Sequence, residues 1–102
     1  MKKYPYVADG WCCGFWNGSP LEIKYSIGRP VRDKKPHTHD FREYCIMIKG
    51  RLTVKVKDKI IVLKEKEVLM FEPNEPHQIL KKEPPKDCRF VVIKEKSYPK
   101  NK

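Results

Sequence analysis

The chain has 102 residues, enough for one domain with a modest core and too few for a second catalytic domain. It contains 23 Lys and Arg against 13 Asp and Glu, a formal net charge of +10, and 39% of its residues are hydrophobic. Lysines alternate with apolar residues at 55–57 and with acids at 64–67, which is typical of a solvated sheet face. Because no stacking aromatics are interspersed among them, we do not expect a nucleic-acid groove.

The composition also indicates the cellular location of the protein. No apolar run approaches the roughly 20 residues of a membrane helix, and the N-terminus leads into no signal-peptide core, so we expect a cytoplasmic protein without membrane partners. The four cysteines are then expected to be free thiols, although three disulfide pairings are formally possible: Cys12, Cys13, Cys45 and Cys88. Many Lys and Glu beside few Asn and Gln suggest a thermophilic source.

Residues 1–20 form a segment of their own in the sequence pattern. Residues 11–16 hold three aromatic rings and two thiols without clear alternation, and we expect them to pack on the body of the fold or on a dimer partner. From residue 21 to residue 27 every second residue is apolar, which predicts a half-buried strand that ends at Gly28.

Short apolar or alternating stretches between turn signals predict further strands at 43–49, 52–57, 60–63, 68–71, 77–80 and 88–93. The strands at 43–49 and 52–57 are interpreted as adjacent. Asn74 lies in a tight turn and suits a left-handed backbone. No helix-period segment of ten residues occurs, so the sequence predicts an all-β sandwich or barrel over 21–94, followed by a polar tail at 95–102 that frays.

Four residues have the chemistry and the spacing of metal ligands. His37 and His39 are two residues apart, so their side chains leave the same face of an extended chain, and Glu43 keeps that parity. His77 begins a different predicted strand, and the chain contains no other histidine. Glu43 begins an apolar run, where an inward carboxylate needs a compensating cation. The pattern predicts a mononuclear site for one divalent transition-metal ion, Fe, Mn, Ni, Co or Zn, with positions left for water or substrate.

Residues 36–43, followed by six residues and Gly50, resemble the first cupin motif, H-x-H-x3-E-x6-G. Residues 72–77 resemble the second motif, whose common form is P-P-G-x-P-H. The resemblance covers about residues 21–93 and implies a small single-domain cupin. It implies an antiparallel jelly-roll β-barrel whose metal ion is bound by His37, His39, Glu43 and His77. The sequence departs from the family pattern at positions that are not ligands: Val31, Lys66, Asn74 and Lys81.

Strand parity also predicts the pocket beside the metal. The parity of Glu43 places Cys45 and Met47 inward, and the parity of His77 does the same for Ile79. These side chains predict a mostly apolar pocket that fits a small organic ligand. Cys45 is interpreted as a small buried hydrophobe in preference to a catalytic thiol.

Two classes of function fit these residues. In the first, the protein is a metal-dependent enzyme, an oxygenase or an isomerase, that acts on a small organic molecule; no catalytic residue beyond the ligands is assigned. In the second, it is a non-catalytic module that binds or senses a small sugar-like effector, since residues 37–43 also resemble sugar-sensing cupin domains that precede helix-turn-helix regulators. The sequence contains no such DNA-binding segment. Arg42 and Arg89 could bind a substrate carboxylate, although a basic protein has many arginines without such a role. A homodimer is expected, because cupin barrels commonly pair through strand edges and apolar faces.

Overall fold

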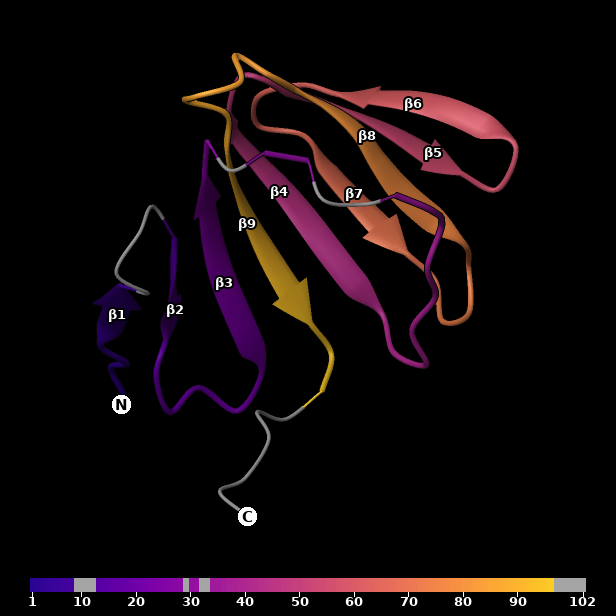
Figure 1. Cartoon of the computed structure of the whole chain (residues 1–102). Coiled ribbons are helices and arrows are strands. Elements are labelled where there is room, and N and C mark those ends of the chain that lie inside the picture. Colours follow the sequence, from indigo (N-terminus) through magenta and orange to yellow (C-terminus); the bar gives the residue numbers. More distant parts are fainter. Residues whose placement is uncertain (9–12, 29, 32–33, 97–102) are drawn as a thin grey trace.

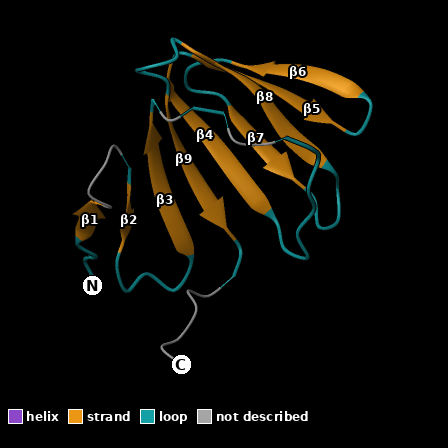
Figure 2. Ribbon diagram, viewed as in Figure 1, coloured by secondary structure: helices purple, strands orange, loops and turns teal. Residues whose placement is uncertain are grey.

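The computed structural model describes residues 1–8, 13–28, 30–31 and 34–96. Within these ranges the chain forms nine strands and no helix (Figure 2). Consequently, the described part of the chain offers no helix with the length and apolarity that a membrane crossing requires. The strands are β1 (Tyr6–Ala8), β2 (Gly14–Trp16), β3 (Glu22–Ile27), β4 (Glu43–Lys49), β5 (Arg51–Val56), β6 (Lys59–Leu63), β7 (Val68–Phe71), β8 (His77–Glu83) and β9 (Arg89–Lys94).

In the described chain these strands build two sheets (Figure 1). The larger sheet has the order β1-β2-β3-β9-β4-β7, and the smaller has the order β6-β5-β8. All described pairs are antiparallel, which confirms the predicted all-β fold. Side chains from both sheets form the buried core: Cys45, Met47, Leu52, Val54, Leu63, Phe71, Cys88 and Phe90. Three cysteines are free thiols, as predicted, and Cys12 lies outside the described residues.

The predicted strand positions agree with the structure better than the predicted pairing does. The strands expected at 43–49 and 68–71 coincide with β4 and β7. The prediction that the strands at 43–49 and 52–57 are adjacent is wrong, because β4 pairs with β7 and β9 while β5 pairs with β6 and β8. The chain changes sheet at Gly50, which has a φ of +83°. A Cβ at this position would overlap the carbonyl oxygen of Glu83, so only glycine fits the crossing.

The N-terminal segment extends the edge of the larger sheet. β2 pairs with β3, and β1 pairs with β2. Trp16 lies on the outer face and contacts the rings of Tyr6 and Tyr25, at centroid distances of 5.2 and 6.4 Å. The neighbouring Phe15 faces the other way and lines a cavity. Of the predicted aromatic segment, residues 11 and 12 lie outside the described residues, as does the tail from residue 97.

β3 has its polar side toward the interior. Glu22 is only 5% exposed, and Lys24 and Ser26 on the same face line a cavity that also contains histidine side chains. The residues between them form the outer face: Ile23, Tyr25 and Ile27. Lys94 of β9 is directly opposite both Glu22 of β3 and Glu43 of β4. This arrangement places a row of charged side chains beside the first residue of β4.

Candidate metal centre

Backbone contacts bring the histidines together. His37 lies between β3 and β4 and forms an isolated antiparallel bridge with His77, through N–H···O distances of 3.0 and 3.1 Å. Asn74 has the predicted left-handed conformation, with a φ of 62°. Its N–H donates to the carbonyl oxygen of His39 at 2.6 Å. The turn that contains Asn74 therefore ties the His37–His39 segment to the start of β8.

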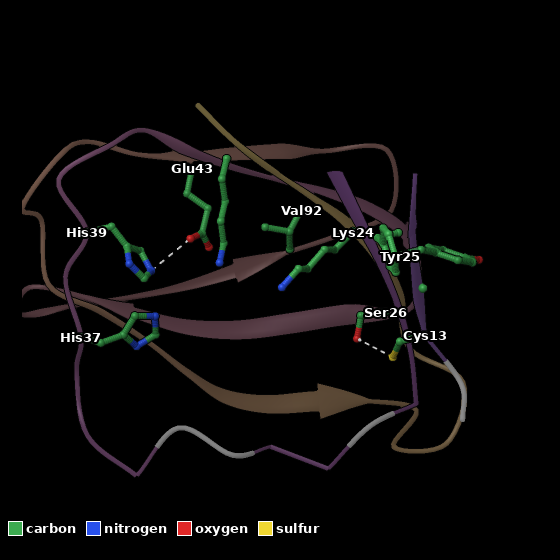
Figure 3. Close-up of a pocket in the computed structure, with 11 residues that line it drawn as sticks. Cys13, Lys24, Tyr25, Ser26, His37, His39, Glu43 and Val92 are labelled. Atoms are coloured by element: carbon green, nitrogen blue, oxygen red, sulfur yellow. Dashed lines mark hydrogen bonds and ion pairs between the residues drawn. The ribbon is translucent and has the colours of Figure 1, made fainter. Parts of the chain in front are cut away.

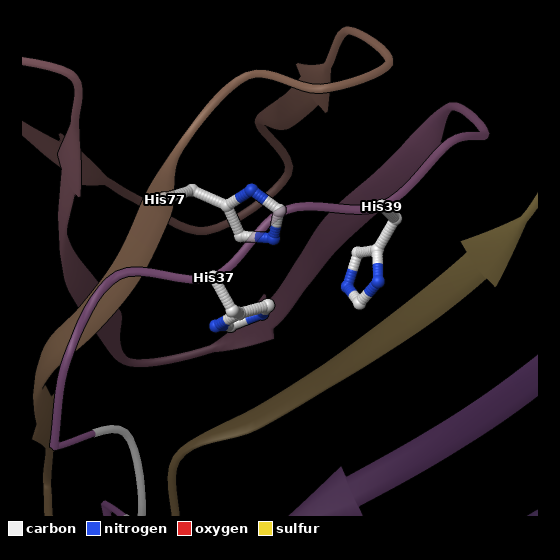
Figure 4. Close-up of side chains that lie close together, drawn as sticks. All are labelled: His37, His39 and His77. Atoms are coloured by element: carbon white, nitrogen blue, oxygen red, sulfur yellow. The ribbon is translucent and has the colours of Figure 1, made fainter.

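The three imidazole rings converge (Figure 4). The ring centroids are 4.3 Å apart for His37 and His77, 5.0 Å for His37 and His39, and 5.4 Å for His39 and His77. One ring nitrogen from each residue lies within 4.8 Å of the others. All histidines of the chain are thus gathered in one cluster.

Glu43, the first residue of β4, lies against this cluster (Figure 3). Its Oε1 is 3.2 Å from Nε2 of His39, and its side chain is 12% exposed. The contact does not have hydrogen-bond geometry, because Oε1 is buried without a hydrogen-bond partner among the described residues. Two ligands that each lie about 2.1 Å from one ion are about 3 to 3.4 Å apart. The observed separation therefore fits two donor atoms that share a cation.

His77 is oriented by its neighbours. Its Nδ1 lies 2.9 Å from the carbonyl oxygen of Glu75, so Nδ1 carries a proton and donates it, and in the neutral ring the lone pair is then on Nε2. The ring of Phe71 stacks on the imidazole at a centroid distance of 4.1 Å and an angle of 12°. Nε2 is buried and has no hydrogen-bond partner in the described part of the chain. A nitrogen with a free lone pair and no partner is available for a metal ion.

His39 is neutral at physiological pH. Burial is the main cause that lowers its pKa from 6.5 to about 4, with smaller effects from neighbouring groups: His37, Lys94, His77 and Lys96. The ring also stacks on Phe41, at 4.8 Å and 14°. Neutral imidazole is the form that binds metals. The candidate ligands are imidazole nitrogens and one carboxylate, and two of their donor atoms lack hydrogen-bond partners in the described chain. Such a ligand set fits a divalent transition-metal ion.

Comparison with known proteins shows the family to which the chain belongs. A family model described as the cupin domain matches residues 29–94, a range that includes the histidine cluster and Glu43. The chain belongs to the cupin family. A search of curated proteins finds no match for this cupin.

Solved structures with the same fold include cupins from several bacteria and an archaeon. A cupin superfamily protein from Desulfitobacterium hafniense matches with a TM-score of 0.67 at 13% identity, over 86% of this chain and 79% of that chain. An RmlC-like cupin with a double-stranded β-helix fold from Methanocaldococcus jannaschii matches with 0.65 at 18% identity, over 92% and 89%. The polyketide cyclase RemF from Streptomyces resistomycificus matches with 0.64 at 16% identity, over 92% and 78%. At these identities the likeness shows the fold alone.

Two cavities of the cupin adjoin the four candidate ligands. The inner one, of about 120 Å³, is lined by His37, Glu43 and His77 and by apolar side chains that include Cys45 and Ile79. Met47, the third residue predicted for this pocket, is 1% exposed and belongs to the core behind it. Burial raises the pKa of the Cys45 thiol to about 12. The thiol therefore stays protonated at neutral pH, which makes it a poor nucleophile and a poor ligand.

The larger cavity has a volume of about 430 Å³ and contains His37, His39 and Glu43 in its wall (Figure 3). Its other polar side chains were not predicted from the sequence: Lys24, Ser26 and Lys94. Alternation in residues 21–27 assigns Lys24 and Ser26 to a solvated face, so the sequence offered no signal for them. At the far end, Sγ of Cys13 lies 3.9 Å from Oγ of Ser26.

The arginines considered for a substrate carboxylate are engaged elsewhere. Nε of Arg42 is 3.1 Å from Oε1 of Glu72, and Nε of Arg89 is 2.8 Å from Oδ1 of Asp87. Neither arginine lines the cavities beside the histidines. The cations of the larger cavity are lysines.

Proposed function

We propose that this cupin binds one divalent transition-metal ion through His37, His39, Glu43 and His77 and acts with it on a small organic molecule, as an oxygenase or an isomerase. The observation that carries the proposal is a pair of buried donor atoms, Nε2 of His77 and Oε1 of Glu43. Neither atom has a hydrogen-bond partner within the described residues. Each belongs to a side chain that borders the same inner cavity as His37.

A cluster without a metal is a costly alternative. An unsatisfied buried polar atom costs about 1–3 kcal/mol, and a small domain is stable by only about 5–15 kcal/mol. Two such atoms in one site would remove a large share of that stability. One bound cation would satisfy both, which is why a metal ion explains the cluster better than a structural role does.

The chain's own residues prepare the site. The carbonyl oxygen of Glu75 holds the Nδ1 proton of His77, and the rings of Phe71 and Phe41 stack on His77 and His39 and limit their rotation. A divalent ion bound there supplies Lewis-acid chemistry and, if it is iron, redox chemistry. Because imidazole binds a metal ion in its neutral form, Glu43 would provide the only negative ligand among the four.

The larger cavity is the proposed substrate-binding site. Its volume of about 430 Å³ accommodates a small organic molecule beside His37, His39 and Glu43. Phe15 and Val92 add apolar surface to its wall. Among the structures with this fold, RemF is named a polyketide cyclase, so enzymes occur on this fold. That analogy supports catalysis in general and no particular reaction.

Metal analysis of protein purified without chelator tests the site. We expect about one divalent ion per chain, and a loss of metal affinity of at least about tenfold in His77→Ala and Glu43→Ala. Glu72→Ala is a matched control, because Glu72 is an exposed carboxylate whose contact is with Arg42. Wild-type protein that takes up no divalent ion would exclude the proposal.

Turnover assays separate the candidate functions. Consumption of dioxygen by the Fe-loaded protein with thiols, diketones and phenols tests the oxygenase. Exchange of carbon-bound hydrogen for solvent deuterium, in ketones and sugars with the Zn, Mn or Ni protein, tests the isomerase. Activity that disappears in His77→Ala would assign the reaction to this site. A protein that binds metal and ligand but shows no turnover in either assay would be the non-catalytic binding module.

A further inference from the structure

We infer that the large cavity binds the oxyanion group of its ligand, a carboxylate or a phosphate, through the ammonium group of Lys24. The inference deepens the proposed function, since it names the charge of the molecule that the same site takes. It rests on the placement of Lys24, on the balance of charges around it and on the engagement of the alternative cations.

Lys24 reaches the cavity from the inner face of β3. It lines the cavity together with His37, His39 and Glu43. Figure 3 shows its side chain leaving β3 and pointing into the cavity toward the end where the histidines lie. The side chain is 54% exposed, and its Nζ is 3.7 Å from Oε2 of Glu22, beyond hydrogen-bond distance. The ammonium group therefore retains donors for a ligand.

Positive charge exceeds negative charge in this part of the protein. Glu22 is a single, 7% exposed carboxylate side chain that faces three ammonium groups, at 3.7 Å for Lys24, 3.2 Å for Lys94 and 3.9 Å for Lys96. Glu43 is the other inward carboxylate, and its backbone position on β4 is directly opposite Lys94 of β9. Three cations thus meet two anions even before a divalent ion is added. An anionic ligand reduces this imbalance, and a cationic ligand increases it.

Lys94 and Lys96 are less available than Lys24. Lys94 lies in the row between Glu22 and Glu43, and its side chain is only 21% exposed. Lys96 lies over the ring of Phe41, at 5.1 Å from the centroid, and does not line the cavity. Lys24 and Lys94 both line the cavity, and Lys24 has the more exposed side chain and the longer distance to Glu22.

The residues that line the cavity also indicate the chemistry of the uncharged part of the ligand. Phe15 and Val92 lie beside Lys24 in the cavity lining and would contact an apolar or aromatic body. The chemical class is therefore a small molecule with an apolar body and one oxyanion group. One end would lie near the four candidate metal ligands and the oxyanion near β3.

NMR titrations that follow the backbone amide resonances of the protein provide the test. Benzoate and benzamide have nearly the same shape and differ in charge, so their dissociation constants are compared by titration, using ¹⁵N-labelled protein as purified and after zinc saturation. Phenyl phosphate is titrated in parallel to distinguish a phosphate from a carboxylate. We expect benzoate to shift resonances of Lys24, Ser26 and Val92 and to bind about two- to fivefold more tightly than benzamide, the size of one partly exposed charge pair.

Variants assign that preference to Lys24. Lys24→Gln should abolish the preference for benzoate, while Lys24→Arg should keep it and Lys59→Gln, on an exposed position of β6, should leave it unchanged. Equal affinities for benzoate and benzamide, or a preference that survives in Lys24→Gln, would overturn the inference. Failure to bind zinc would defeat the proposed function alone, because the comparison in the protein as purified still decides the role of Lys24.

Discussion

Glu43→Gln should change the metal-free and the metal-bound protein in opposite directions. Without metal, the Glu43 side chain is 12% exposed, and its Oε1 has no hydrogen-bond partner among the described residues. The nearby His39 offers no positive charge at neutral pH, because its pKa is about 4. A neutral amide of nearly the same size removes the cost of holding a carboxylate there. With metal, the same substitution removes a charged ligand.

The two effects can be compared in magnitude. Removal of one unsatisfied buried charge should stabilise the metal-free protein by about 1 kcal/mol, which raises Tm by about 4–8 °C in a domain of this size. Metal at 100 times its Kd stabilises the wild type by about 2.7 kcal/mol. If the variant binds 100-fold more weakly, the same concentration stabilises it by about 0.4 kcal/mol. With metal, the variant should therefore be less stable than the wild type by about 1.3 kcal/mol.

Urea unfolding followed by tryptophan fluorescence measures both quantities. The wild type and the variant are unfolded in chelator and again with metal at 100 times the wild-type Kd. Glu72→Gln removes an exposed carboxylate and controls for the change in net charge. If Glu43→Gln is less stable than the wild type in chelator, the protein itself satisfies the carboxylate, and Glu43 has no need of a metal ion.

Three further predictions concern Phe71, Cys45 and the outer face of the larger sheet. Phe71→Leu removes the ring stacked on His77 and should cost about 1 kcal/mol of stability and weaken metal binding several-fold in calorimetry; unchanged affinity would show that the ring only fills the core. Cys45 has a pKa of about 12 when folded and 9.0 ordinarily, so the unfolded chain loses this proton first. The free energy of unfolding should therefore fall between pH 9 and 12, by up to about 1.4 kcal/mol per pH unit, and Cys45→Ala should lack that part of the slope in urea unfolding; equal slopes would contradict this. Exposed Ile48 and Val68 on the outer sheet face favour a homodimer, which should sediment at about twice the 12.1 kDa chain mass and dissociate in Val68→Lys; a monomeric wild type would refute it.

Strand positions were predictable from the sequence where short apolar or alternating stretches lie between turn signals. β4 and β7 were predicted at their observed bounds from such apolar stretches. The strands with which β4 and β5 pair were not predictable in this way. Their pairing depends on the backbone of Gly50, where the chain crosses from one sheet to the other. β1 and β2 have three residues each, too few for an alternation to be recognised.

The candidate site was predictable where spacing alone decides geometry. Parity places His37, His39 and Glu43 on one face, and the structure has these side chains around one cavity. His77 was included because it begins another predicted strand and is the one remaining histidine of the chain, and the resemblance to cupins implied the same role; periodicity carries no information on which loops meet. The contacts that orient His77, from Glu75 and Phe71, depend on the bridge between the His37 segment and β8, which only the folded chain reveals.

Lys24 shows a limit of alternation that has a physical cause. Alternation in β3 shows that its two faces differ, but the interior face is decided by what covers the strand. The described core cluster takes side chains from β4, β5, β6, β7 and β9 and none from β3. The inner face of β3 borders the open cavity instead, and the polar residues of β3 lie on that face. The apolar residues of β3 face outward. Burial of Glu22 on that face has a desolvation cost that an apolar residue would not have. A charged wall beside the candidate metal ligands is therefore expected to have a use in binding, and the ratio of benzoate to benzamide affinity measures that use directly.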